Sequence, residues 1–125
     1  MQLLRGVHSR LPFGAAFSGP TAGWLHGLDL APCDPVEVTI PDWCGVSARS
    51  GTMVRRALLD PDELVEIDGL PATSELRTVV DIGRNQPLVE ATAAVDMALH
   101  QGMVSLAELW AWADAGAGTK GVARL

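Results

Sequence analysis

The sequence predicts one α+β domain, with a small, mostly antiparallel sheet of three or four short strands, an N-terminal helix and three C-terminal helices. The 125 residues suit a single domain, and 48 % of them are hydrophobic, so the chain can bury a core. Strand patterns gather between residues 36 and 73, and helix patterns follow them. Strands that precede helices, rather than alternating with them, favour the α+β class over a parallel βαβ array.

The N-terminal part offers one clear helix. Ser18 is a candidate N-cap, Pro20 stands near the helix start, and residues 21–26 make about two turns before Gly27. Residues 1–7 fit either a short helix or the remnant of a longer one.

Two strands are expected next. Residues 36–40 alternate apolar and polar side chains, which predicts a half-buried strand that ends at Pro41. Residues 52–58 also have strand composition. Because neighbouring side chains in a strand point to opposite faces, Arg55 and Arg56 should lie on opposite sides of the sheet.

A β-hairpin is expected around Asp68-Gly69. This dipeptide lies between the apolar runs 63–67 and 70–73, and it is the strongest short hairpin signal that a sequence offers. Because Pro71 lacks a backbone N–H, the returning arm should be an edge strand or very short.

Three helices are expected after residue 73. Ser74 caps the first, Pro87 opens the second, and Ser105 with Glu108 forms a capping box for the third. The expected inward residues are Leu76, Val79, Val80 and Gly83 in the first helix, Leu88, Ala91, Val95, Ala98 and Leu99 in the second, and Leu106, Leu109, Trp110 and Ala113 in the third. Residues 116–125 are rich in Ala and Gly, which predicts a flexible tail.

The charge of the chain is acidic and uneven. The formal net charge is −6, and residues 61–115 hold ten acids against two arginines. Such a balance disfavours strong nucleic-acid binding, which uses clustered Lys and Arg. Any DNA contact is therefore expected to be weak and to use the arginines of the first half. They are Arg5, Arg10, Arg49, Arg55 and Arg56.

The sequence contains no familiar catalytic or metal-binding pattern. Gly118-Thr119-Lys120-Gly121 has the wrong order for a phosphate-binding loop. Cys33 and Cys44 are farther apart than the close pairs of structural zinc sites, and the three histidines have no nucleophile motif beside them. We therefore predict no enzyme activity, catalytic residue, metal, cofactor or small-molecule substrate.

The chain also lacks the patterns of secretion and membrane insertion. Arg5, His8 and Arg10 interrupt the first 17 residues, so no signal-peptide core forms there. No stretch approaches the roughly 20 apolar residues of a membrane helix. We expect a cytoplasmic protein with reduced cysteines and no membrane partner.

Four tryptophans and no tyrosine make the aromatic residues candidates for partner contacts. Trp110 and Trp112 lie two apart, so they cannot share one face of a helix. One ring should be buried and the other partly exposed. We select Trp43 and Trp112 as candidate partner-contact residues because exposed aromatics often anchor interfaces.

Several segments carry a resemblance to a known family. They read FSGPTAGWLHGL at 17–28, PVEVTIP at 35–41 and VEIDGLPATSELRTVVD at 65–81, and the pattern of 88–109 follows them. Over roughly residues 15–113, in this order, the chain resembles an actinobacterial group of proteins related to the AbiEi antitoxins of type IV toxin–antitoxin systems.

The resemblance implies a place within a larger architecture. In the family a DNA-binding winged helix-turn-helix often precedes this region, and a domain related to very-short-patch-repair endonucleases often follows it. We expect residues 18–115 to form the AbiEi-like α+β domain. Residues 1–17 would be an N-terminal segment and candidate remnant of a winged helix, and residues 116–125 the tail.

Three functions are compatible with these observations. The leading hypothesis is a non-catalytic regulatory module that binds a protein partner, either a cognate toxin or a second copy, in a DNA-bound assembly. The first alternative is a truncated part of a very-short-patch-repair-like endonuclease protein that lacks its catalytic domain. The second is a stand-alone DNA-binding domain that uses the five arginines.

Overall fold

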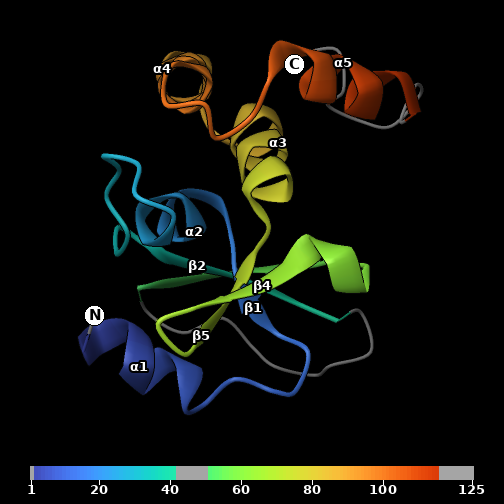
Figure 1. Ribbon diagram of the computed structural model, residues 1–125. Coiled ribbons are helices and arrows are strands. Elements are labelled where there is room, and N and C mark those ends of the chain that lie inside the picture. The colour runs from blue at the N-terminus through green and yellow to red at the C-terminus, as the bar shows by residue number, and fades with distance from the viewer. Residues whose placement is uncertain (1, 42–50, 116–125) are drawn as a thin grey trace.

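The computed structural model describes residues 2–41 and 51–115, in which a five-stranded sheet has helices on both faces (Figure 1). The helices are α1 (Gln2–His8), α2 (Gly19–Leu25), α3 (Glu75–Asn85), α4 (Leu88–His100) and α5 (Leu106–Ala115). The strands are β1 (Ala16–Phe17), β2 (Val36–Ile40), β3 (Thr52–Arg56), β4 (Leu64–Ile67) and β5 (Leu70–Thr73), with a 3-10 turn η1 (Pro61–Glu63) before β4.

The strand order is β3-β2-β1-β5-β4, so the short β1 joins two strand pairs. Strand β1 is antiparallel to β2, with Phe17 opposite Val38, and parallel to β5, with Phe17 opposite Ala72. Strands β2 and β3 are parallel, and β4 and β5 form an antiparallel hairpin. In Figure 1, α1 lies on one side of the sheet, α2 and α3 lie on the other, and α4 and α5 lie beyond α3.

The α+β class is confirmed, but the expected sheet had too few strands and too few parallel pairings. The sheet has five strands rather than three or four, and two of its four pairings are parallel rather than antiparallel. The missed strand is β1. It has only two residues, too few for an alternating pattern, and its hydrogen-bond partners are distant in the sequence.

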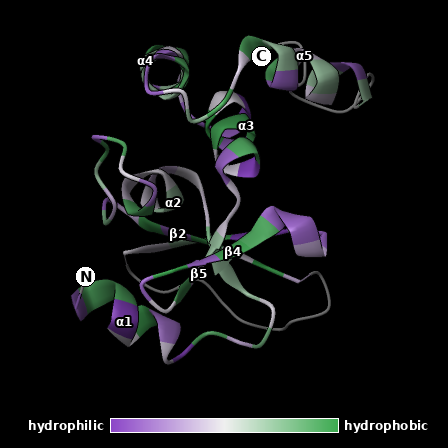
Figure 2. Ribbon diagram, in the orientation of Figure 1, coloured by the Kyte–Doolittle hydropathy of each residue, from purple (hydrophilic) through white to green (hydrophobic). Residues whose placement is uncertain are grey.

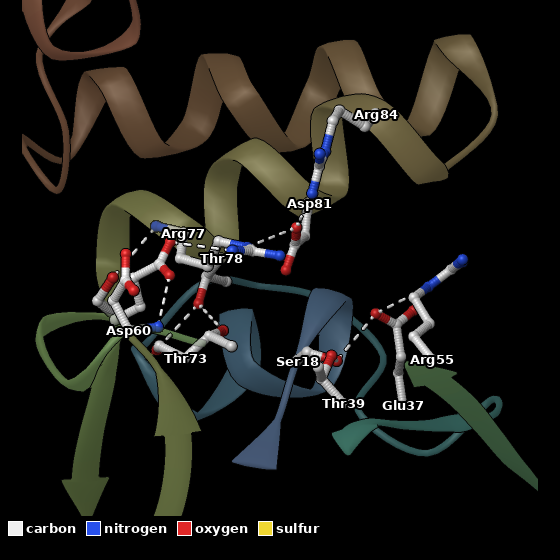
Figure 3. A network of polar contacts seen from close by, with 12 residues as sticks. Ser18, Glu37, Thr39, Arg55, Asp60, Thr73, Arg77, Thr78, Asp81 and Arg84 are labelled. Carbon is white, nitrogen blue, oxygen red and sulfur yellow. Dashed lines mark hydrogen bonds and ion pairs between the residues drawn. The ribbon is translucent and has the colours of Figure 1, made fainter. Parts of the chain in front are cut away.

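Strand β2 is buried on both sides, whereas the alternating sequence predicted a half-buried strand. All five of its residues are buried because it lies inside the sheet between helical layers. Val36, Val38 and Ile40 pack in the cluster that contains Leu4 of α1. The alternate residues of β2 therefore point toward α2 and α3 (Figure 3).

The hairpin signal and two of the helix-start signals are confirmed. Asp68 and Gly69 both have positive φ, 51° and 82°, as a two-residue type I′ turn requires. Pro71 lies in a four-residue strand, so the returning arm is very short, but it is interior rather than an edge. Ser74 accepts a 3.2 Å hydrogen bond from the backbone N–H of Arg77. The capping box of α5 is also present, with bonds of 2.9 and 3.0 Å.

The inward faces of the outer helices differ from the expected ones. In α4 the buried residues are Ala91, Ala94 and Ala98, whereas Leu88 is 67 % exposed. In α5 only Leu109 is buried, and Trp110 is 68 % exposed. Both helices pack mainly on α3, so one narrow stripe of each is covered.

The apolar interior consists of two clusters. One lies between α1 and the sheet, where Leu4, Val7 and Phe17 pack with the apolar residues of β2. The other joins the C-terminal helices through Val79, Val80 and their neighbours. Residues 2–17 thus contribute a helix, a strand and core side chains to this fold.

Candidate functional site

A layer of buried polar side chains separates the sheet from α3 (Figure 3). We call it the polar layer, and its members are Ser18, Glu37, Thr39, Thr73, Thr78 and Asp81, each no more than 3 % exposed. Buried polar groups are tolerated only when they are hydrogen-bonded or paired. The contacts of this layer therefore determine how α3 sits on the sheet.

Glu37 is the buried charge at the β2 end of the layer. Ser18 Oγ donates to Glu37 Oε2 at 3.1 Å, and Thr39 Oγ1 donates to Ser18 Oγ at 2.8 Å. Arg55 of β3 places Nε 3.3 Å from Glu37 Oε2. Burial raises the pKa of Glu37 above its ordinary value, and the charge of Arg55 only partly offsets this effect.

The backbone of Gly19 lies against the Glu37 carboxylate. Gly19 has φ +56°, and a Cβ built there would overlap the carboxylate oxygens. Ser18 occupies the N-cap position of α2, as expected, but its side chain caps nothing and bonds Glu37 instead. The start of α2 is therefore shaped around the buried carboxylate.

Arg77 holds the other end of the layer. It donates from Nε to Asp81 Oδ1 at 3.0 Å and from Nη1 to Glu63 Oε2 at 2.9 Å. Burial opposes the charge of Arg77, but the two carboxylates outweigh it and raise its pKa. Arg77 and Asp81 form an i,i+4 ion pair on α3, and the contact of Arg77 with Glu63 also ties α3 to the turn η1.

Arg84 extends this network to α5. Its Nη2 donates to Asp81 Oδ1 at 2.7 Å, and its guanidinium carbon lies 5.2 Å from the centre of the Trp112 ring. That distance is within the range of a cation–π interaction. Asp81 therefore accepts hydrogen bonds from two arginines, one of which orients a tryptophan of the last helix.

A groove opens where η1, the start of α3 and α5 meet. It has a volume of about 500 Å³. We call it the acidic groove, and it is lined by Asp60, Asp62, Glu63, Ser74, Glu75, Leu76, Arg77, Met103, Glu108 and Trp112. Figure 2 shows hydrophilic residues (purple) over η1 and near the start of α3. Five carboxylates thus face one guanidinium, which Glu63 and Asp81 already engage.

The arginines predicted to contact DNA do not form one patch in the described part of the chain. Arg5 donates to the backbone oxygen of Asp68 at 3.1 Å, beside the β4–β5 hairpin. Arg55 and Arg56 lie on β3, at the opposite edge of the sheet. Arg10 is exposed just after α1. Arg49 lies outside the described residues, and DNA binding by this set stays a prediction.

Arg55 and Arg56 point to opposite faces, as expected. Arg55 turns toward the polar layer and pairs with Glu37, whereas Arg56 is exposed. The charge of Arg55 is thus engaged within the fold, which leaves it less available for a phosphate.

The two tryptophans of α5 differ in exposure. Trp110 has the exposed ring, whereas Trp112 is partly buried against the cluster of C-terminal helices and lines the acidic groove. A partner contact by Trp112 stays a prediction. Trp43, the other candidate, lies outside the described residues.

Sequence reasoning missed Glu37 and Glu63 as members of this network. Glu37 was expected on the outward side of a half-buried strand, and Glu63 was expected at the start of the first hairpin arm. The available signal was that Ser18, Glu37 and Thr39 are polar residues with strongly apolar neighbours. Only the tertiary fold brings the three together.

Among the described residues, no hydrogen bond or ion pair joins His26 or Cys33 to a nucleophile or an acid. His26 Nε2 lies 2.8 Å from the backbone oxygen of Thr73, which makes it a donor that links α2 to β5. Cys33 is exposed with a free thiol. Within residues 2–41 and 51–115, no group of three or more His, Cys, Asp or Glu side chains could hold a metal ion. None of the described helices is long and apolar enough to cross a membrane.

The fold and its internal network define a small α+β module whose buried charges pair with one another. The family model of the AbiEi antitoxin C-terminal domain matches residues 15–125. The match covers most of the chain, so the chain belongs to this family, which supports a regulatory module of a toxin–antitoxin system. Neither the curated proteins nor the solved structures gave a significant match.

Proposed function

We propose that this chain is a non-catalytic, cytoplasmic antitoxin module that acts by binding a protein partner. The observation that carries the proposal is the match to the AbiEi antitoxin C-terminal domain over residues 15–125. The charged side chains support it, because Glu37 and Asp81 are engaged by arginines inside the fold. Such a hydrogen-bonded network stabilises the fold, and the fold in turn holds the surface that a partner would contact.

Neutralisation of a toxin is the test of this function. The gene that neighbours this one is expressed in a bacterial host with and without this chain, and growth is followed. We expect the neighbouring product to arrest growth and the chain to restore it. Arrest that is equal with and without the chain would refute the proposal, as would a neighbouring product with no effect on growth.

A DNA-bound assembly is the finer part of this proposal. The exposed arginines Arg5, Arg10 and Arg56 are its candidate phosphate contacts. They lie on a chain of net charge −6, so DNA contact by this module alone should be weak. A mobility-shift titration of operator DNA with the chain, the partner, and both together tests it. At about 200 mM salt we expect a shifted complex only when both are present.

A further inference from the structure

We propose that the acidic groove binds a cationic, partly apolar segment of the protein partner, one in which arginine or lysine stands next to an aliphatic side chain. This inference rests on the proposed function and adds to it the location and the chemistry of the contact. Its basis is a groove whose lining combines three partly buried apolar side chains with five carboxylates, on a strongly acidic part of the chain.

The lining of the groove combines apolar and charged side chains. Leu76, Met103 and Trp112 line it, and each is partly buried and packs against the C-terminal helical cluster. Among the lining carboxylates, Asp62 belongs to η1, Glu75 to α3 and Glu108 to α5. A ligand of about 500 Å³ would bury apolar and cationic groups together.

The carboxylates that line the groove differ in the contacts they already make within the fold. Glu63 accepts from Arg77 and from the backbone N–H of Asp60, and Glu108 accepts from the backbone N–H of Ser105. Asp62 and Glu75 are exposed and have no such contact within the described part of the chain. These two groups can therefore accept hydrogen bonds from an incoming cation without breaking an internal bond.

The electrostatic field of the groove selects the sign of its ligand. Residues 61–115 carry ten acids and two arginines, Arg77 and Arg84, and both arginines are held by Asp81. Clustered charge of one sign in a cleft attracts the opposite charge and repels its own. A cationic segment is thus favoured, and an anionic or nucleic-acid ligand is disfavoured.

Trp112 supplies the groove with an aromatic side chain. Arg84 lies 5.2 Å from its ring centre and is itself paired with Asp81, so the ring already has one cationic neighbour within the fold. Tryptophan is the best aromatic partner for a cation and is frequent in interface hot spots. A groove lined by this ring and by carboxylates suits a guanidinium or ammonium group, which can contact both.

A single metal ion fits this arrangement less well than a peptide does. In the part of the chain that the structure describes, no group of three His, Cys, Asp or Glu converges as metal ligands. The carboxylates are distributed over η1, α3 and α5. Several cationic side chains along one segment match that spacing.

The binding test uses a fluorescein-labelled peptide of alternating arginine and leucine, titrated with the full chain and followed by anisotropy. The groove variant is Asp62→Asn with Glu75→Gln. The matched control is Glu90→Gln with Asp96→Asn on α4, which removes the same charge from exposed positions outside the groove. Circular dichroism verifies that both variants fold.

We expect the groove variant to weaken binding of the peptide about tenfold and the control variant less than about twofold. Replacing the arginines of the peptide with glutamine should abolish binding. An equal loss in the two variants would mean attraction to net charge alone and would overturn the groove. Unchanged binding in the groove variant would also overturn it.

The growth assay separates this inference from the proposed function. If the wild-type chain and the control variant neutralise the toxin and the groove variant does not, the groove is supported. If the groove variant neutralises as well as the wild type, the groove is wrong and the antitoxin function stands. If the wild type itself fails, the function is wrong, and the peptide titration still decides whether the groove binds cations.

Discussion

Glu37 is the residue around which the sheet and α2 are arranged. A buried carboxylate must be compensated, and here Ser18, Arg55 and the close backbone of Gly19 surround it. The hydroxyl of Thr39 donates to Ser18, which itself donates to the carboxylate, so the two bonds polarise each other. Substitutions at these positions should therefore change the free energy of unfolding more than the small change in side-chain volume suggests.

Gly19→Ala should destabilise the fold by about 2 kcal/mol or more, because it adds a Cβ at positive φ against the Glu37 carboxylate. Gly6→Ala is the matched control. No atom lies within 4 Å of the added Cβ at Gly6, and alanine favours a helix, so this variant should gain up to about 1 kcal/mol. Urea unfolding measures both. Equal effects at the two sites would contradict the close approach of Gly19.

Glu37→Gln tests the raised pKa through the pH dependence of stability. The folded protein holds the Glu37 proton more tightly than the unfolded chain, whose glutamate has the ordinary value of 4.5. The stability that comes from this difference is full below that value and is lost as the pH rises through the folded-state pKa. The free energy of unfolding of wild type relative to Glu37→Gln should thus fall as the pH rises from 4.5 toward neutrality.

Urea titrations of both proteins across that range measure this difference. The exposed Glu66→Gln is the control, and it should change stability by less than about 0.5 kcal/mol. A difference between wild type and Glu37→Gln that rises with pH would show that the carboxylate is stabilised in its ionised form.

Arg77→Ala should cost about 3 kcal/mol, because it leaves the buried Asp81 without one of its two arginines and frees Glu63. Arg10→Ala removes an exposed arginine and should change stability by less than about 0.5 kcal/mol. Chemical denaturation of the two variants compares them. Similar small losses would mean that the network around Asp81 contributes little.

At the scale of the elements, local signals predicted the parts that local interactions determine. The hairpin at Asp68-Gly69 and the caps at Ser74 and Ser105 depend on residues within a few positions of one another. Strand β1 and the parallel pairing of β2 with β3 depend on distant contacts, so the sequence pattern did not contain them. The same holds for the candidate site, whose members come from separate elements.

The C-terminal helices should differ in local stability. In α3 six consecutive residues from Thr78 to Gly83 are buried, whereas in α5 only Leu109 is buried. Amide protection follows the burial and contact density of an element. Hydrogen exchange should therefore be slowest in α3 and much faster in α5. Equal protection of the two helices would indicate that α5 is covered by a surface of another molecule.

At the scale of the whole molecule, a polar layer divides the apolar interior into a sheet cluster and a helical cluster. Helix α3 contacts both the helical cluster and the sheet. Its Val79 packs with the C-terminal helices, and its Thr78 hydrogen-bonds Thr73 of β5. The acidic groove opens at the start of α3, next to the Glu63–Arg77 pair that links η1 to this helix. A partner in the groove would therefore contact the elements that hold the two clusters together.

The distribution of charge predicts how tightly the isolated chain binds DNA. Residues 61–115 repel phosphate, and the described arginines of the first half are divided between the β4–β5 hairpin and β3 at the opposite edge of the sheet. A short duplex should therefore bind weakly at about 50 mM salt and lose its affinity by about 200 mM, because only scattered phosphate contacts are made. A mobility-shift titration with wild type and with Arg55→Ala plus Arg56→Ala measures this. Submicromolar binding that persists at the higher salt and disappears in the double variant would show instead that β3 carries a DNA-binding surface.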